Sequence, residues 1–183
     1  MILINDNLIA ELKLYIKEHY RLVSFTGIFP DMKKTGKKRI NKKTKGIKGK
    51  SFSEVSDLMS GFINEKRDYE SFAFVLDKLR EEKGISPAEL YKAAWIDKRL
   101  YSKIMATANY HPAKSTAIAF GLALKLKPVD FSEFLQNAGF ALSNSSIFDL
   151  VVRFCVEREI FDLHDVNAIL LQADQKTLIK EAA

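Results

Sequence analysis

The chain has 183 residues, 47% of them hydrophobic and 28% charged, which is typical of a folded soluble protein rather than a disordered one. Its one cysteine, Cys155, excludes a disulfide framework and a cysteine-based zinc site, and agrees with a reducing cytoplasm. No apolar run approaches the roughly 18 residues that a membrane span needs, so we expect a cytoplasmic protein that contacts no membrane.

Before residue 33, apolar side chains recur every three or four positions and predict an amphipathic helix over residues 6–23. This helix either docks on the body of the protein, pairs with its copy in a dimer or binds another protein. The apolar side of the helix is formed by Leu8, Ile9, Leu12, Tyr15 and Ile16.

The net charge of +6 is concentrated in residues 33–50, which hold ten basic side chains and no acidic one. The rest of the chain carries −4, from 19 basic and 23 acidic side chains. Clustered cations repel one another and release counterions when they meet phosphates. We interpret this segment as a flexible basic arm, which is either a solvated linker or an attractor of nucleic-acid phosphates, DNA or RNA. Acidic protein surfaces or anionic lipid could also be met in this way. The cations of the arm are Lys33, Lys34, Lys37, Lys38, Arg39, Lys42, Lys43, Lys45, Lys48 and Lys50.

After the arm the pattern is helical to the end, and we find no convincing strand. Ser51 and Glu54 have the spacing of a capping box, and a helix start is predicted there. The next helix is predicted to stop at Gly84, because glycine readily adopts the left-handed conformation that ends a helix. The apolar positions of these two helices are Val55, Leu58, Met59, Phe62 and Ile63, then Phe72, Val75, Leu76 and Leu79.

Residues 86–107 predict two short helices in succession. Ser86, Pro87 and Glu89 supply an N-cap, a first-turn proline and a third-position glutamate, which together mark a helix start. A break follows near Trp95, and Asp97 is expected to cap a helix from residue 98 to about 107. The inward positions are Leu90, Ala94, Ile104 and either Leu100 or Tyr101.

The remaining pattern predicts four more helices and so an all-α fold. The first covers residues 115–126 and is ended by Pro128. The second is expected to start from a capping box of Asp130 and Glu133 and to close at Gly139. The last two cover residues 147–159 and 166–171.

Five short helices, with a helix–turn–helix as the second and third, resemble the Cro/lambda-repressor family, also called the XRE type, over about residues 71–137. Tyr91 stands where the family favours alanine and Trp95 where it favours glycine, so we expect a wider helix crossing or a differently built turn. Residues 138–143 and the helical extension after them resemble a bacterial subgroup of the family. The matched positions are Leu90, Ala94, Ile96, Ile104, Pro112, Gly121 and Leu124.

The resemblance implies sequence-specific binding of double-stranded DNA, with the third helix of the domain in the major groove. Arg99 is the candidate for a two-bond contact with guanine, and Ser102 can serve several bases. The predicted DNA-binding set is Lys98, Arg99, Ser102, Lys103, Thr107, Tyr110, His111 and Lys114. The chain then divides into an N-terminal helix (1–32), the arm (33–50), a helix–turn–helix domain with a preceding helix (51–142) and a helical extension (143–183).

The resulting hypothesis is a transcriptional regulator that binds DNA as a homodimer. One alternative is a protein-interaction adaptor with a protein partner, in a bacterial defence or toxin-type system. Another is sequence-independent nucleic-acid binding led by the arm.

We expect no enzymatic activity, no metal and no cofactor, because the chain has no phosphate-binding glycine motif, metalloprotease motif or nucleophile elbow. The cluster of Asp162, His164 and Asp165 is explained by a helix start, with an aspartate as the cap. Cys155 lies among apolar residues and is expected to be a small buried side chain.

Overall fold

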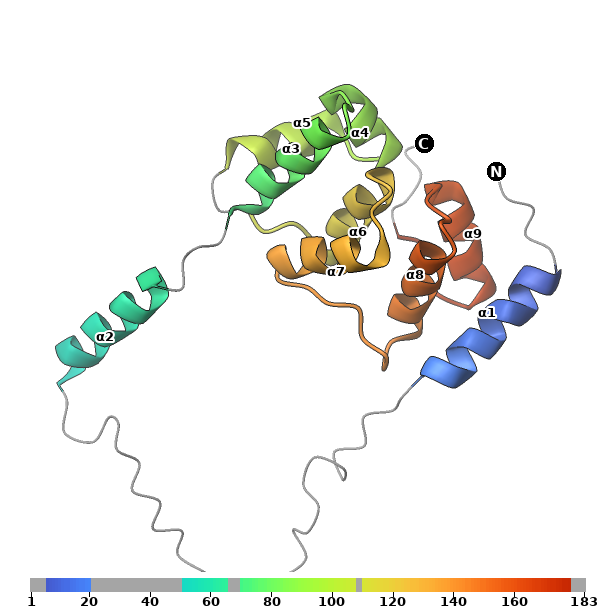
Figure 1. The fold of residues 1–183 in the computed structure, drawn as a ribbon, viewed down its shortest axis with the longest axis horizontal. Helices are drawn as coiled ribbons and strands as arrows, with labels where there is room; N and C mark the ends of the chain where they lie inside the picture. The colour runs from blue at the N-terminus through green and yellow to red at the C-terminus, as the bar shows by residue number, and fades with distance from the viewer. Residues whose placement is uncertain (1–5, 21–50, 66–69, 108–109, 179–183) are drawn as a thin grey trace, which may run out of the picture. The chain divides into compact units, whose positions relative to one another are not determined.

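The computed structural model describes residues 6–20, 51–65, 70–107 and 110–178, and these residues are all-helical, with no strand (Figure 1). The basic arm and its ten cations lie outside the described residues. The chain divides into two compact units, one of residues 1–22 and 70–183 and one of residues 23–69. The helices are α1 (Asp6–His19), α2 (Phe52–Glu65), α3 (Phe72–Glu82), α4 (Pro87–Ala93), α5 (Lys98–Ala106), α6 (Lys114–Ala123), α7 (Pro128–Asn137), α8 (Ile147–Glu157) and α9 (Leu163–Gln172).

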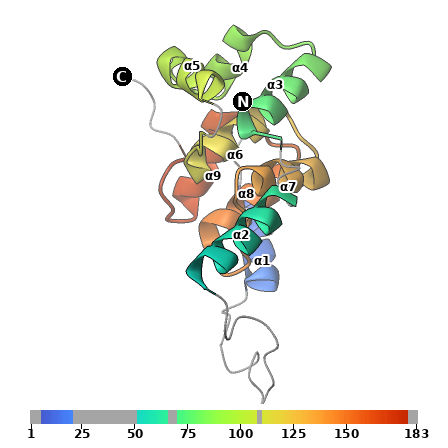
Figure 2. The ribbon, with the colours of Figure 1, turned by 90° about the vertical axis from the view of Figure 1, so that its left-hand side faces the viewer.

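Helix α6 is the centre of the larger unit, and α4, α7 and α9 pack against it (Figure 2). Seven of its ten residues are buried, because its sequence is apolar on every side. A helix of this kind is stable only when other helices surround it. Aromatic side chains of its neighbours fill the space around it: the rings of Phe72 and Phe134 lie 5.2 Å apart, and the Tyr101 ring lies 6.2 Å from that of Phe120.

Helix α1 docks on α8 of the same unit, which is the first of the three roles considered for it. Leu12 and Tyr15 are buried in this contact, and the Tyr15 ring meets Phe154 edge-on at 5.3 Å. Burial raises the pKa of the Tyr15 hydroxyl above its ordinary value. An ion pair between Arg158 and Glu11 lies at the edge of the contact. The N-terminal helix therefore belongs to the same folded unit as the C-terminal extension.

Among the described residues, six helices from α3 to α9 are followed by a residue with positive φ, which turns the chain out of the helix. After α3 this residue is Gly84, as predicted, and the next N–H, that of Ile85, donates to the Arg80 carbonyl at 3.1 Å. This pair of features is a Schellman ending, which satisfies carbonyl groups at the helix end. The six residues with positive φ are Gly84, Trp95, Lys125, Gly139, Glu159 and Asp174.

Two predicted details of α6 and α7 are wrong. The helix expected over residues 115–126 ends at Ala123, because Lys125 takes a positive φ of 49° before Pro128 is reached. The capping box expected from Asp130 and Glu133 does not form, because α7 already begins at Pro128 with Lys127 as its N-cap. Proline needs no N–H partner in the first turn, so the helix starts three residues earlier than expected and Asp130 lies within that turn.

The capping box of Ser51 and Glu54 is confirmed: the Ser51 N–H donates to the Glu54 carboxylate at 2.7 Å, and the Glu54 N–H donates to the Ser51 hydroxyl at 3.3 Å. The other predicted boundaries differ by a few residues. Helix α9 begins at Leu163, three residues before the predicted start. Its N-cap is Asp162, whose carboxylate accepts from the N–H groups of His164 and Asp165.

Gly121 permits the close packing of α6 on α7. A Cβ atom at this position would lie 2.6 Å from the Cε2 atom of Phe131, a residue that is only 1% exposed, so the ring would have to shift. We expect Gly121→Ala to lower the free energy of unfolding, because overpacking costs about 1–3 kcal/mol and the gain in helix propensity is only about 1 kcal/mol. Urea denaturation followed by circular dichroism measures the change.

Gly61→Ala in α2 is the matched control, because a Cβ atom there meets nothing within 4 Å. It should leave the unfolding midpoint of the larger unit unchanged. A Gly121→Ala protein as stable as the unsubstituted chain would show that the contact between α6 and α7 is looser than described.

Candidate nucleic-acid interface

Helix α4 begins with the predicted capping box. The Ser86 N–H donates to the Glu89 carboxylate at 2.8 Å, and the Glu89 N–H donates to the Ser86 hydroxyl at 3.2 Å. These bonds to Ser86 hold the pKa of the Glu89 carboxyl below its ordinary value. Leu90 is fully buried, so α4 is fixed both at its start and along its inner face.

The turn from α4 to α5 is built around Trp95, which has a φ of 51°. The Trp95 N–H donates to the Lys92 carbonyl at 3.0 Å, and the Ile96 N–H donates to the Tyr91 carbonyl at 2.8 Å. Trp95 therefore adopts the left-handed conformation that glycine accepts most readily. The backbone at Trp95 thus has the glycine-type conformation, and the expected wider crossing of the two helices stays a prediction.

Helix α5 has one buried face and one exposed face. Asp97 caps it, as predicted, with its carboxylate accepting from the Arg99 N–H at 2.6 Å. Tyr101 and Ile104 are buried, which decides between Leu100 and Tyr101 as the inward residue. The predicted DNA-binding residues of this helix and its C-cap are all exposed, namely Lys98, Arg99, Ser102, Lys103 and Thr107.

The exposed face of α5 continues into the segment that follows it. The Lys103 ammonium lies 5.8 Å from the centre of the Tyr110 ring, a cation–π distance. Tyr110 is half-buried, and His111 is exposed. The structure thus brings Lys103 and Tyr110 together and leaves both the ammonium and His111 accessible to a ligand.

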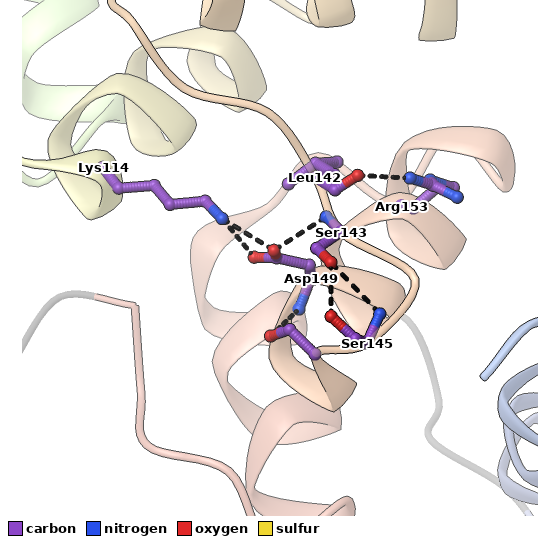
Figure 3. A network of polar contacts seen from close by, with 7 residues as sticks. Lys114, Leu142, Ser143, Ser145, Asp149 and Arg153 are labelled. Carbon is purple, nitrogen blue, oxygen red and sulfur yellow. Dashed lines mark hydrogen bonds and ion pairs between the residues drawn. The ribbon is translucent and has the colours of Figure 1, made fainter. Parts of the chain in front are cut away.

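Lys114, the last residue of the predicted set, has a partner within the protein. Its ammonium lies 2.7 Å from both carboxylate oxygens of Asp149 (Figure 3). Asp149 is only 3% exposed, and its carboxylate also accepts from the Ser143 N–H at 2.8 Å. This ion pair joins the first residue of α6 to α8. Lys114 is therefore engaged in an ion pair within the protein, whereas Lys103 of α5 contacts the Tyr110 ring.

The chain between α7 and α8 is held by a second cation, Arg153. Its guanidinium donates to the Leu142 carbonyl at 2.6 Å (Figure 3). It also donates to the side-chain oxygen of Asn144. Sequence reasoning missed Asp149 and Arg153 because the partners of their side chains are six to 35 residues away. The one available signal was a charged residue at each of two positions in the apolar run of α8.

The other chemically interesting residues have structural explanations. Cys155 is fully buried, as expected, and burial raises the pKa of its thiol to about 12. His164 is exposed on the first turn of α9, next to the cap Asp162. Within the described ranges, no group of three or more His, Cys, Asp or Glu side chains gathers to hold a metal ion.

Comparisons with known proteins identify no relative: no family model, no curated protein and no solved structure matches this chain. No helix in the described part of the chain is long and apolar enough to span a membrane.

Replacing Asp149 should destabilise the protein. Asp149→Asn removes the counter-ion of Lys114, and breaking a buried pair costs about 3–5 kcal/mol. We expect the lower end of that range, because the Lys114 side chain keeps 32% of its exposure and regains some hydration. Asp130→Asn, at an exposed position of α7, is the control and should have little effect on the urea midpoint. Equal midpoints for the two variants would contradict a structural role for the pair.

The Cys155 thiol should be unreactive in the native protein. A thiol with a pKa of about 12 forms almost no thiolate at pH 8, and the fully buried side chain excludes the reagent. Labelling with a chromogenic disulfide reagent should proceed at the rate of unfolding and reach one thiol per chain in denaturant. Complete labelling of the native protein within the mixing time would contradict the described packing of α8.

Proposed function

We propose that α3–α7 form a helix–turn–helix domain of the Cro/lambda-repressor type and that the protein binds specific sequences of double-stranded DNA as a transcriptional regulator. The observation that supports this most is the division of α5 into a buried face with Tyr101 and Ile104 and an exposed face with Lys98, Arg99 and Lys103. A helix anchored on one side, with cations on the other, suits the major groove of DNA.

The surroundings of α5 support the same proposal. Helices α3 and α4 both pack against α5, and the short turn at Trp95 fixes the direction of α5 relative to α4. A contact with base edges requires such rigidity, because a loosely held helix loses its register on the groove. The buried residues Leu90, Ala94 and Ile104 occupy the positions that the family resemblance assigns to the interior.

The exposed side chains take different roles in this proposal. Arg99 reads a guanine through two hydrogen bonds, and Ser102 contacts a neighbouring base. Lys98 and Lys103 hold phosphates, which fixes the protein on the duplex without selecting a sequence. Tyr110 and His111 contact the DNA backbone beyond the end of α5. We assign Lys114 to the ion pair with Asp149 instead, because its ammonium is already satisfied there.

The basic arm adds affinity that is independent of sequence in this proposal, because its ten cations release counterions on any nucleic acid. The arm must therefore be separated from α5 in an experiment. Deleting residues 1–50 would also remove α1 and uncover its binding face on α8. Replacing the ten cations with glutamine avoids this loss and keeps α1 in place.

The decisive experiment is a binding selection from a randomised duplex pool with the arm-neutralised protein at near-physiological salt. We expect one enriched motif, with two half-sites if the protein binds as a dimer. No enrichment would contradict specific DNA reading. If the unsubstituted chain still bound every sequence in a salt-sensitive way, the arm alone would account for nucleic-acid binding; if it bound no DNA, the protein-interaction adaptor would be favoured.

Single substitutions on α5 should distinguish base-specific recognition from sequence-independent binding of phosphates. Arg99→Ala should weaken binding of the selected site by about 1–3 kcal/mol and relax selectivity at one base position. Lys103→Ala should weaken binding of all sequences alike and reduce the slope of log affinity against log salt by about one. Lys78→Ala, at an exposed cation of α3, is the control and should change neither. A fluorescence-anisotropy titration over several salt concentrations measures all three.

A further inference from the structure

A pocket of about 600 Å³ lies between α7 and α8 in the larger unit. Its lining comes from these two helices and the connection between them, so its shape is set by this unit alone. The apolar part of the lining includes Phe131 and Val156, which are buried, and Leu142, which is half-buried. A volume of roughly 300–1,000 Å³ with an apolar lining is typical of pockets that bind small molecules.

The side chains that line the pocket do not fill it. Ser132 is short, and its hydroxyl donates back to the Pro128 carbonyl of its own helix at 2.9 Å. At the connection, the Arg153 guanidinium donates to the Leu142 carbonyl and so holds the segment that carries Leu142 (Figure 3). The folded chain therefore forms the pocket without help from a ligand.

The charge of the lining is negative, opposite in sign to the net charge of +6 of the whole chain. The lining holds two carboxylates, those of Glu133 and Glu157, and one cation, Arg153. The Arg153 guanidinium bonds to the Leu142 carbonyl and the Asn144 side chain. Among the described residues, no ion pair joins either carboxylate to a cation.

Both carboxylates are exposed and keep acceptor positions for a ligand. A carboxylate has about four lone-pair sites, so Glu157 retains some beside its interaction with the Tyr15 hydroxyl of α1. A cation forms the strongest hydrogen bonds with such acceptors, whereas an anion would be repelled. The apolar part of the lining favours a hydrocarbon body on that cation, because burying a fully hydrated ion against it would be costly.

We propose that this pocket binds a small organic cation, with its ammonium group held by Glu133 and Glu157 and its apolar body against Phe131, Leu142 and Val156. The apolar contacts supply affinity, and the two carboxylates select the sign of the charge. The inference is independent of the proposed DNA binding, because no residue of α5 lines the pocket.

Three probes with the same phenyl ring and two-carbon link test the proposal on the full chain. They are the cation phenethylammonium, the neutral phenethyl alcohol and the anion phenylpropionate. Titrations followed through the backbone amide signals in NMR give both the affinity and the location of binding. Phenethylammonium should shift signals of α7, α8 and their connection in a saturable way. Phenethyl alcohol should bind more weakly, and phenylpropionate at least about tenfold more weakly than the cation, because like charges repel.

Substitutions in the lining separate the charge from the apolar contact. Glu133→Gln together with Glu157→Gln should weaken phenethylammonium binding by about fivefold or more and leave phenethyl alcohol nearly unchanged. Asp130→Asn removes a carboxylate from α7 outside the pocket, so this control should change neither. Ser132→Leu should weaken all three probes, because its side chain occupies the space that they need.

Equal binding of the three probes, or signal shifts away from α7 and α8, would overturn the inference. Phenethylammonium that shows no saturable binding to the unsubstituted chain would do the same. If the probe bound only the arm-neutralised protein, the pocket would belong to a lysine of the chain itself rather than to a small molecule. None of these measurements contains DNA, so their outcome is separate from that of the duplex selection.

Discussion

The fold depends on how the C-terminal ends of its short helices satisfy their backbone carbonyl groups. Helices α3 to α9 are only 7 to 11 residues long, so a large share of their backbone groups lies in the first and last turns, where no intrahelical partner exists. In the part of the chain that the structure describes, a residue with positive φ closes six of these ends. The residue after it is apolar in five of them: Ile85, Ile96, Leu126, Phe140 and Ile160. The same short segment thus satisfies the carbonyls, reverses the chain and adds a side chain to the core.

These endings also show what sequence reasoning recovers here and what it misses. Apolar spacing and N-cap chemistry are local, so the starts at Ser86 and Asp97 and the ends at Gly84 and Gly139 follow from neighbouring residues. A positive φ at Trp95 or Lys125 does not, because nothing in those residue types favours it. In the fold, the hydrogen bonds of the helix ending accompany that conformation: the Ile96 N–H donates to the Tyr91 carbonyl and the Leu126 N–H donates to the Gly121 carbonyl.

The candidate interface likewise has features that local sequence predicts and features that depend on distant residues. The exposed set on α5 follows from its periodicity, because Tyr101 and Ile104 mark the inner face and the cations fall opposite. The state of Lys114 does not follow, since its partner Asp149 is 35 residues away and belongs to another helix. From the sequence alone, every lysine or arginine could bind a phosphate. The folded structure distinguishes exposed cations such as Arg99 from cations such as Lys114, which forms an ion pair within the protein. The proposed contacts of Arg99 and Lys103 rest on that division.

The docking of α1 on α8 has a consequence for the whole chain. Because α1 and α3 belong to the same compact unit, the intervening stretch, with its ten cations and α2, leaves that unit and returns to it. In the sequence this stretch connects α1 to α3, two helices of one unit. A single proteolytic cut within it would give two fragments that remain associated through α1 and α8. The larger unit is therefore built from two segments that are separate in the sequence, residues 1–22 and 70–183.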